Sequence, residues 1–226
     1  MNSNTIGRMI ESISFKNVKP KFIDDAPAGA SSMVWNCDVT FNRGCSYLVE
    51  AASGRGKSSF CSFLYGLRSD FGGNIIYKHN GCGALRHADC DFQLLRRESI
   101  SMMFQELRLF PELSPVDNVM LKSNITGFAT ETEVRGMLER LGLAGHLDTP
   151  CAVLSFGQQQ RVAFVRALCQ PFDFILLDEP VSHLDNENAA VMSAMLKESQ
   201  LQNGAGVIVT SIGYRMPYLY DKILNL

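Results

Sequence analysis

The sequence predicts an α/β fold in which helices flank a mostly parallel sheet, and two patterns carry that prediction. The last third of the chain alternates helical and buried-strand segments, and it ends in strand-like runs at residues 207–209 and 222–224. Such alternation is typical of a parallel sheet with helices on both faces. Residues 174–177 form an apolar run without alternation, which indicates a central strand buried on both sides.

The earlier part of the chain reads as strands followed by helices. Strand patterns occur at residues 13–18, 33–35, 39–41 and 45–49. A segment rich in Pro, Gly, Ala and Ser at 24–32 is expected to be a loop. Residues 105–149 are expected to be helical, because Thr130 and Glu133 form a capping-box pattern before apolar residues at helical spacing.

Composition indicates a globular protein and excludes several functional classes. With 226 residues and 46% hydrophobic content, the chain fits one domain with a substantial core. A formal net charge of −2 and a pI near 6.1 argue against a nucleic-acid-binding surface. No apolar run approaches the ~18 residues that span a bilayer. The first residues are polar and lack the apolar core of a signal peptide.

Cysteine usage favours a reducing, cytoplasmic location. The seven cysteines are odd in number and show no C-x-x-C spacing. Four possible zinc ligands lie close together at His79, Cys82, His87 and Cys90. They lack the paired spacing of zinc ligands, so we do not expect a metal there.

A glycine-rich loop between a strand and a helix predicts a phosphate-binding site. The loop nearly matches the pattern G-x-x-x-x-G-K-[ST]. It comprises Ala51, Ala52, Ser53, Gly54, Arg55, Gly56, Lys57, Ser58 and Ser59. Backbone N–H groups of such a loop point at one anion, while Lys57 faces the outer phosphates and the Ser58 hydroxyl holds Mg²⁺. The alternative is a surface turn that carries an incidental lysine.

Two acidic residues follow the apolar run at 174–177. Ligands of open α/β sheets bind beyond the carboxyl ends of the strands, where Asp178 and Glu179 lie. Asp178 suits Mg²⁺, which favours one or two carboxylates and keeps several waters. Glu179 suits the polarisation of an attacking water. The alternative is an Asp-Glu pair that caps a helix.

Together with the glycine-rich loop, three segments make the chain resemble the ATP-binding cassette (ABC) ATPases. They are Leu-Ser-Phe-Gly-Gln at 154–158, Asp-Glu-Pro at 178–180 and Ser-His-Leu-Asp at 182–185. The segment 109–119 is similar to ATPases of the lipoprotein-release, macrolide-export and cell-division group. The resemblance covers almost the whole chain and implies one P-loop NTPase domain of ABC type at 1–226. It also implies an antiparallel β lobe at about 10–50 and a helical subdomain inserted at about 105–150.

The resemblance also implies further site residues. Gln105 matches a glutamine that contacts Mg²⁺ or the attacking water and senses the transporter. Phe22 lies where the family stacks an aromatic ring on adenine, although such a residue is as often part of a core. The remaining matches to nucleotide-binding positions are Ser155, Gly157, Gln158 and Asp185. In the family, the signature residues bind ATP held by the opposite subunit, so that two ATPs lie between head-to-tail subunits.

Three positions depart from the family pattern. Ala51 replaces a glycine, and a positive φ there would cost about 1–2 kcal/mol. Phe156 replaces the first signature glycine. Ser211 lies where the family places a switch histidine, and its short neutral hydroxyl has less reach toward a γ-phosphate. Arg215 or His183 are candidates to substitute for that histidine.

The resemblance therefore implies a subunit that binds and hydrolyses Mg-ATP as a dimer and drives an integral membrane permease. The second ATPase subunit is expected to be another copy of the chain, and the dimer is expected in the cytoplasm, attached peripherally to the membrane through the permease. Ser211 and Phe156 favour an alternative, an ATP-gated interaction module with slow or no hydrolysis. A third hypothesis is a soluble ABC ATPase that serves cofactor assembly. No nucleic-acid partner is expected.

Overall fold

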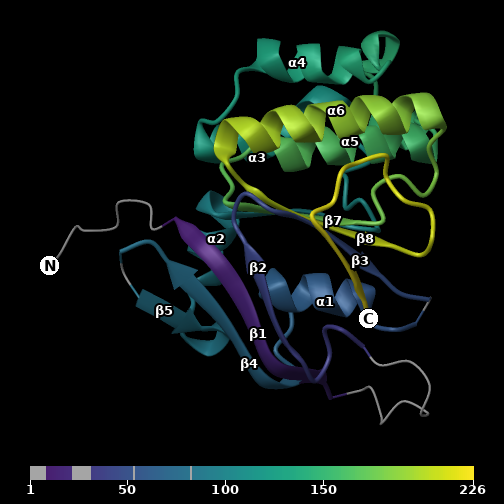
Figure 1. Cartoon of the computed structure of the whole chain (residues 1–226). Helices are drawn as coiled ribbons and strands as arrows, with labels where there is room; N and C mark the ends of the chain where they lie inside the picture. Colours follow the sequence, from purple (N-terminus) through teal and green to yellow (C-terminus); the bar gives the residue numbers. More distant parts are fainter. Residues whose placement is uncertain (1–8, 22–31, 53, 82) are drawn as a thin grey trace, which may run out of the picture.

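The protein is built from two sheets, with helices on both faces of one of them (Figure 1). The computed structural model describes residues 9–21, 32–52, 54–81 and 83–226. The parallel sheet consists, in spatial order, of β6 (Ile100–Met103), β7 (Phe174–Asp178), β8 (Gly206–Ser211), β3 (Ser46–Glu50) and β9 (Lys222–Asn225). All of its neighbouring strands pair in parallel. The predicted fold class is therefore confirmed.

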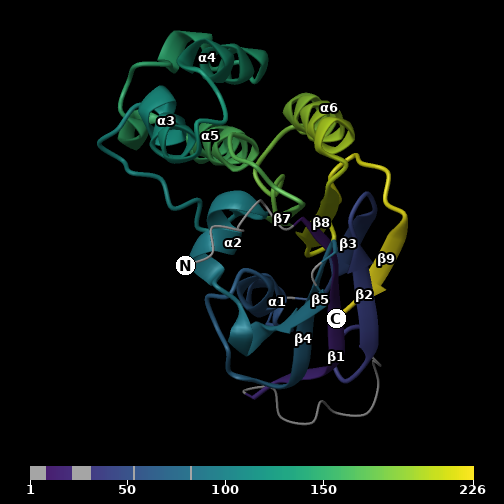
Figure 2. The ribbon, with the colours of Figure 1, turned by 90° about the vertical axis from the view of Figure 1, so that its left-hand side faces the viewer.

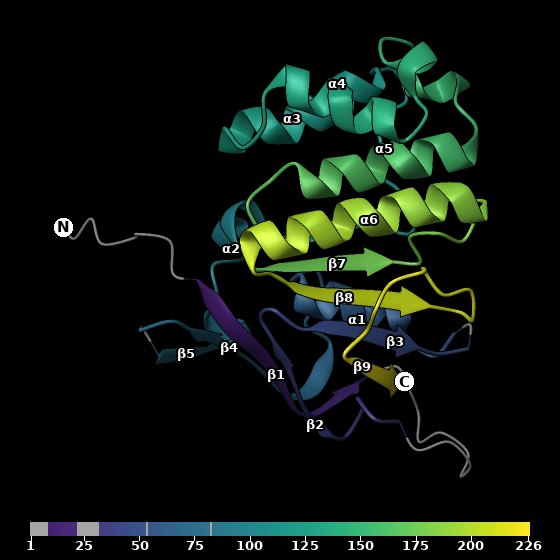
Figure 3. The ribbon, with the colours of Figure 1, turned by 45° about the horizontal axis from the view of Figure 1, so that its top comes forward.

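Helices cover both faces of the parallel sheet, as Figures 1 and 3 show. The helix α1 (Lys57–Leu64) lies on one face, and α5 (Phe156–Leu168) and α6 (Asn186–Asn203) lie on the other. Successive residues of β7 alternate between the two cores: Ile175 and Leu177 pack with the helical layer, whereas Phe174 and Leu176 pack with α1 and the second sheet. This double burial explains the unbroken apolar run that predicted a central strand.

The second sheet is antiparallel and lies on the α1 side of the parallel sheet (Figure 2). Its strands, in spatial order, are β2 (Asp38–Asn42), β1 (Ile10–Pro20), β4 (Phe71–His79) and β5 (Gly83–Arg86). Its membership differs from the β lobe expected at about 10–50. The strand β3 lies in that range but pairs in the parallel sheet, while β4 and β5 join from beyond it. Strand pairing is a non-local property, which the spacing along the chain does not reveal.

The strand predicted at residues 33–35 is wrong, because this segment is a bend followed by a turn. The Ser32 hydroxyl accepts hydrogen bonds from the backbone N–H groups of Val34 (3.0 Å) and Trp35 (2.7 Å). A serine that bonds to the following backbone in this way stabilises a turn and uses donors that a strand needs for pairing. Trp35 is buried between aromatic rings, and its indole donates to the Arg55 carbonyl. Nearly all of the loop expected at 24–32 lies outside the described residues.

Two further helices extend the helical layer beside α5, and the second of them is the outermost, at the top of Figures 1 and 2. They are α3 (Pro115–Thr126) and α4 (Glu131–Arg140), while α2 (Phe92–Glu98) precedes β6. Single 3₁₀ turns occur at His87–Asp89, Ala144–His146 and Cys151–Val153. The predicted capping box at Thr130 and Glu133 is confirmed at the start of α4. No helix in the described part of the chain has both the length and the apolar character needed to cross a membrane.

The helical prediction for residues 105–149 is right for α3 and α4. It is wrong for residues 141–149, which are turns around the 3₁₀ turn Ala144–His146, and for residues 105–114. There the chain makes turns, and Leu107 and Arg108 both adopt positive φ, 59° and 50°. A right-handed helix cannot continue through two left-handed residues. The helix α3 begins only at Pro115, because a proline is well tolerated in the first turn of a helix and Ser114 supplies the N-cap.

Candidate functional site

The glycine-rich loop connects the end of β3 to the start of α1, the strand–loop–helix context that the motif requires. Gly54 (φ 79°) and Gly56 (φ 92°) adopt the left-handed conformation that glycine allows at little cost. Gly56 is the N-cap of α1, and no side chain caps this helix end. Ala51 is absent from the described non-glycine residues with positive φ, so the strain considered for it does not arise.

Lys57 lies buried beneath this loop, with 5% of the residue exposed. Its Nζ donates to the carbonyl oxygens of Ala51 (3.1 Å) and Ala52 (3.2 Å). The same Nζ lies 3.7 Å from Glu179 Oε1, so a buried ammonium faces a buried carboxylate. Burying a charge is costly unless it is paired and hydrogen-bonded, and both conditions hold here. The amine is therefore held in place before any ligand arrives.

Asp178 closes β7, and the backbone of Glu179 turns sharply after it. Asp178 is 2% exposed, and the Thr210 hydroxyl donates to its Oδ1 at 2.5 Å. Burial raises the pKa of Asp178, while the hydrogen bonds from Thr210 and Ser58 oppose that rise. Burial likewise raises the pKa of Glu179, and the nearby Lys57 charge opposes it. Both carboxyl groups are thus poorly solvated and next to groups that favour their ionised form.

Glu179 has φ 53°, a left-handed conformation that costs a non-glycine residue about 1–2 kcal/mol. Its N–H donates to the backbone and side-chain oxygens of Thr210, and its carbonyl accepts from Gln160 Nε2 at 3.1 Å. Strained backbone of this kind persists where the surroundings over-determine it, and it clusters at functional sites. Together with hydrogen bonds from Ser182 to the same carbonyl, these contacts fix the backbone from which the Glu179 side chain reaches Lys57.

A chain of side-chain contacts links Ser58, Gln105 and Glu179. Ser58 Oγ donates to Gln105 Oε1 at 3.2 Å, and Gln105 Nε2 lies 3.5 Å from Glu179 Oε2. These residues come from the start of α1, the loop after β6 and the end of β7. Ser58, Gln105 and Asp178 offer hydroxyl, amide and carboxylate oxygens, the donor set that Mg²⁺ prefers. The residues expected to hold the metal are therefore brought together, and their chemistry fits it.

The signature segment forms the start of α5. Ser155 is the N-cap and forms a capping box with Gln158: Ser155 Oγ accepts from the Gln158 N–H, and Gln158 Oε1 accepts from the Ser155 N–H. A Cβ at Gly157 would lie 2.9 Å from the His183 carbonyl oxygen, so α5 and the segment before α6 touch here. Asp185 caps α6 by accepting from the Asn188 N–H at 2.8 Å, and these hydrogen bonds lower its pKa.

The signature segment and the glycine-rich loop do not meet within one chain. Among the described residues, no hydrogen bond or ion pair joins 155–158 to 51–59. Phe156, the residue that departs from the signature pattern, lies partly exposed with its ring centroid 4.5 Å from that of His183. If the signature segment and the glycine-rich loop bind the same nucleotide, they must therefore come from two different subunits.

Ser211 is 2% exposed, and its hydroxyl is already engaged in a local turn. Its Oγ donates to the Tyr214 carbonyl at 2.8 Å and accepts from the Gly213 N–H at 3.1 Å. The two possible substitutes also have partners. Arg215 binds Glu50 through two hydrogen bonds of 2.7 Å, and His183 Nδ1 lies 2.9 Å from Ser182 Oγ. Among the described residues, no hydrogen bond or ion pair joins any of these three side chains to Lys57 or Glu179, although His183 lies near enough to Glu179 for its charge to lower the pKa of that carboxyl.

Two residues that the sequence assigns to the site, Phe22 and Ser53, lie outside the described residues. The sequence did not point to two residues that support the site. Thr210 binds both the Glu179 N–H and the Asp178 carboxylate, and Gln160 donates to the Glu179 carbonyl. Thr210 had a usable signal: it is a polar residue at the carboxyl end of an apolar strand, and it pairs with Asp178 across β7 and β8.

The possible zinc ligands do not form a metal-binding group in the described part of the chain, from which Cys82 is missing. His87 is buried, with Nε2 3.0 Å from the Phe63 carbonyl, and burial lowers its pKa. Cys90 Sγ donates to the Arg86 carbonyl at 3.3 Å.

Comparison with known proteins gives consistent similarities. A family model described as ABC transporter matches residues 34–182. The lipoprotein-releasing system ATP-binding protein LolD of Saccharophagus degradans is 30% identical over 177 residues, 77% of either chain. The putative hemin import ATP-binding protein HrtA of Staphylococcus haemolyticus is 31% identical over 195 residues, 84% of this chain and 86% of its own length.

A longer relative and a solved structure extend these similarities. The macrolide export ATP-binding/permease protein MacB 1 of Aeromonas hydrophila is 35% identical over 176 residues, which is 76% of this chain but 27% of that protein. The dimeric structure of MJ0796, a bacterial ABC transporter cassette, superposes with a TM-score of 0.69 at 26% identity and covers 88% of this chain and 87% of its own.

Proposed function

Because the chain belongs to the ABC transporter family and is an ATPase of that family, as the sequence predicted, we propose that it energises a membrane permease. In this proposal two copies of the chain bind two Mg-ATP molecules head to tail, and hydrolysis drives the permease between conformations. The protein then works in the cytoplasm, attached to the membrane through its partner. The observation that carries the proposal is the joint placement of Lys57, Ser58, Gln105, Asp178 and Glu179.

The nucleotide phosphates fit the glycine-rich loop at the start of α1. The left-handed glycines shape the loop, the helix end offers backbone N–H groups without a side-chain cap, and Lys57 supplies a positive charge. Ser58, Asp178 and Gln105 would hold Mg²⁺, and the bound ion would neutralise charge on the phosphate oxygens. Lys57 then exchanges its bonds to the loop carbonyls for bonds to phosphate.

Glu179 is the residue that we assign to the attacking water. Its carboxylate is shielded from solvent and linked to Gln105, and its backbone is held by hydrogen bonds to Thr210 and Gln160. A general base of this kind works best when its pKa lies nearer the working pH, and burial moves the pKa of Glu179 in that direction. Gln105, whose Nε2 lies 3.5 Å from Glu179 Oε2, would help to position the same water.

The dimer arrangement is supported by the signature helix. Ser155 and Gly157 lie at the start of α5, and within the chain they have no contact with the described part of the phosphate loop. Anions bind readily at helix starts, so a nucleotide on a second subunit fits this position. In this proposal ATP joins the two copies, and its hydrolysis removes the charge that holds them.

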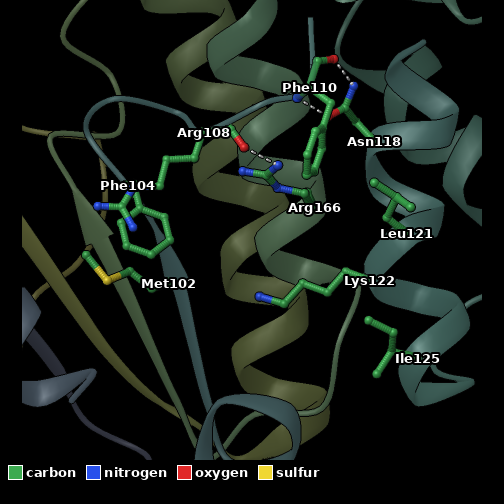
Figure 4. Close-up of a pocket in the computed structure, with 9 residues that line it drawn as sticks. All are labelled: Met102, Phe104, Arg108, Phe110, Asn118, Leu121, Lys122, Ile125 and Arg166. Carbon is green, nitrogen blue, oxygen red and sulfur yellow. Dashed lines mark hydrogen bonds between the residues drawn. The ribbon is translucent and has the colours of Figure 1, made fainter. Parts of the chain in front are cut away.

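We place the contact with the permease at a pocket of about 260 Å³ beside the Gln105 loop (Figure 4). Its lining combines apolar side chains with the cationic residues Arg108, Lys122 and Arg166 and contains no carboxylate. Burial, with a smaller effect of Arg166, lowers the pKa of Lys122 to about 8. A cytoplasmic segment of the permease that carries apolar and acidic side chains complements this lining.

A second function is favoured by Ser211. The position of the switch histidine holds a serine whose hydroxyl is committed to a turn, which fits an ATP-gated interaction module that hydrolyses slowly or not at all. In that case ATP binding still joins two subunits and regulates the membrane partner.

Steady-state phosphate release with Mg-ATP tests these proposals. We expect slow hydrolysis by the wild type and a further loss of about 10²–10⁴-fold in Glu179→Gln, which keeps the shape of the side chain without its charge. Light scattering should show that this variant accumulates as an ATP-bound dimer. Equal rates for the wild type and Glu179→Gln would contradict the assigned role, whereas dimerisation without hydrolysis by the wild type would support the interaction module.

A further inference from the structure

The turn after Gln105 contains two successive left-handed residues that are not glycine. Leu107 has φ 59° and Arg108 has φ 50°. For such residues this conformation is disfavoured by roughly 5- to 30-fold each, so a pair of them requires external support. Part of the support is the Leu107 side chain, which is 3% exposed in the core of the helical layer.

The other support comes from Arg166 in the last turns of α5. Its NH2 donates to the Leu107 carbonyl at 2.5 Å and its NH1 donates to the Arg108 carbonyl at 2.7 Å. Figure 4 shows this guanidinium group reaching from the helix to the loop. The planar fork of arginine fits two adjacent carbonyl groups, a geometry that a lysine ammonium does not reproduce.

The same turn is connected to Gln105 on its other side. The Leu107 N–H donates to the Phe104 carbonyl at 3.0 Å, which closes a turn around Gln105. The Arg108 guanidinium lies 3.9 Å from the centre of the Phe104 ring. Gln105 is therefore bracketed by residues whose positions depend on the left-handed pair, while its own side chain reaches Ser58 and Glu179.

We propose that Arg166 is a positioning residue for Gln105: by binding the Leu107 and Arg108 carbonyls, it holds the strained turn that sets the Gln105 side chain between Ser58 and Glu179. Loss of the fork lets the turn relax toward right-handed conformations and withdraws Gln105 from the site. Arg166 and Lys122 both line the pocket beside this turn. An acidic group that enters the pocket therefore competes with the Leu107 and Arg108 carbonyls for the Arg166 guanidinium. This inference rests on the proposed function, since Gln105 acts there on Mg-ATP.

The test compares ATP affinity with Mg²⁺ and with EDTA by calorimetry. The affinity for ATP in EDTA depends on the phosphate loop. The increase in ATP affinity when Mg²⁺ is present, here called the gain from Mg²⁺, depends on Ser58, Asp178 and Gln105. In Arg166→Met we expect the gain to fall by about 5- to 30-fold, the penalty of one left-handed residue, with the affinity in EDTA nearly unchanged. Arg166→Lys keeps the charge but loses the fork, so it should show most of the same loss.

A second substitution separates positioning from general damage. Arg108→Gly removes the left-handed penalty at an exposed residue, so adding it to Arg166→Met should restore several-fold of the gain from Mg²⁺. Arg108→Ala is the matched control, because it removes the same side chain but keeps the penalty, and it should restore nothing. A purely structural role for Arg166 predicts no difference between the two double variants.

Hydrogen exchange on the nucleotide-free protein gives an independent readout. The Leu107 amide should exchange faster in Arg166→Met and in Arg166→Lys than in the wild type. Unchanged exchange, an unchanged gain from Mg²⁺, or parallel losses of affinity with Mg²⁺ and with EDTA would overturn the inference. A wild type that does not bind Mg-ATP would instead overturn the proposed function, so the two failures are distinguishable.

Discussion

Gly157→Ala tests whether the signature helix is packed against the segment before α6 as closely as the structure shows. The added Cβ would lie 2.9 Å from the His183 carbonyl oxygen and 3.3 Å from Leu184 Cδ2. Carbon and oxygen atoms do not approach to 2.9 Å without a shift, and the oxygen belongs to the backbone. Forcing an extra carbon into a packed contact costs about 1–3 kcal/mol.

The substitution also has a favourable part, because alanine is preferred over glycine inside a helix by about 1 kcal/mol. The gain is smaller in a first turn, so the net change should be a loss of up to about 2 kcal/mol. Gly136→Ala is the matched control: Gly136 lies inside α4, and a Cβ there meets nothing within 4 Å. It should stabilise the protein by up to about 1 kcal/mol.

Thermal unfolding without nucleotide measures both effects. For a chain of this size 1 kcal/mol corresponds to about 2–4 °C in Tm, so the two variants should shift in opposite directions. Light scattering in a Glu179→Gln background should show weaker ATP-dependent dimerisation for Gly157→Ala only, because Gly157 lies in the proposed dimer contact and the displaced segment leads into Asp185. Equal stabilisation by both alanines would refute the close approach of α5 to His183.

Three further outcomes follow from burial and hydrogen bonding. Burial raises the pKa of Asp178, so ionisation of this carboxyl group destabilises the folded protein. The destabilisation begins as the pH rises above the ordinary carboxyl pKa, and it is complete once the pH exceeds the raised pKa. Asp178→Asn should therefore raise Tm at neutral pH and abolish the gain in ATP affinity from Mg²⁺, whereas a lower Tm at every pH would contradict the burial argument. Ser211→Ala removes the hydrogen bonds of its hydroxyl to the Gly213 N–H and the Tyr214 carbonyl. Because Gly213 and Tyr214 are exposed and water can replace the hydroxyl, denaturant unfolding should show a loss of about 0.5–1.5 kcal/mol; no loss would argue against the turn. Arg215→Ala should leave phosphate release unchanged, because Arg215 is bound to Glu50, and a large fall in rate would identify it as the substitute for the switch histidine.

Local sequence patterns predicted most of the fold. The apolar run of β7, the capping box of α4 and the strand–loop–helix context of the phosphate loop all follow from short-range rules. Two of the failures have short-range causes. Ser32 turns the chain where a strand was expected, and the left-handed pair at 107–108 ends the helical pattern before α3 begins. The composition of the antiparallel sheet was missed because pairing joins strands far apart in the chain.

The sequence also predicted only part of the candidate site. Motif spacing located Lys57, Asp178 and Glu179, because a strand end fixes where such residues lie in space. Spacing did not reveal that Glu179 is left-handed, because that conformation depends on contacts from Thr210 and Gln160.

The affinity for Mg-ATP of the wild type and of Lys57→Ala, measured side by side, tests the central claim most directly. Lys57 is buried beneath the loop with its amine held by two carbonyls and a carboxylate, and no other cation is aimed there by the motif. The account predicts binding by the wild type and loss of detectable binding in the variant, with Arg55→Ala as an exposed control that retains binding. Equal affinity of the wild type and Lys57→Ala would contradict the assignment of this loop as the nucleotide site.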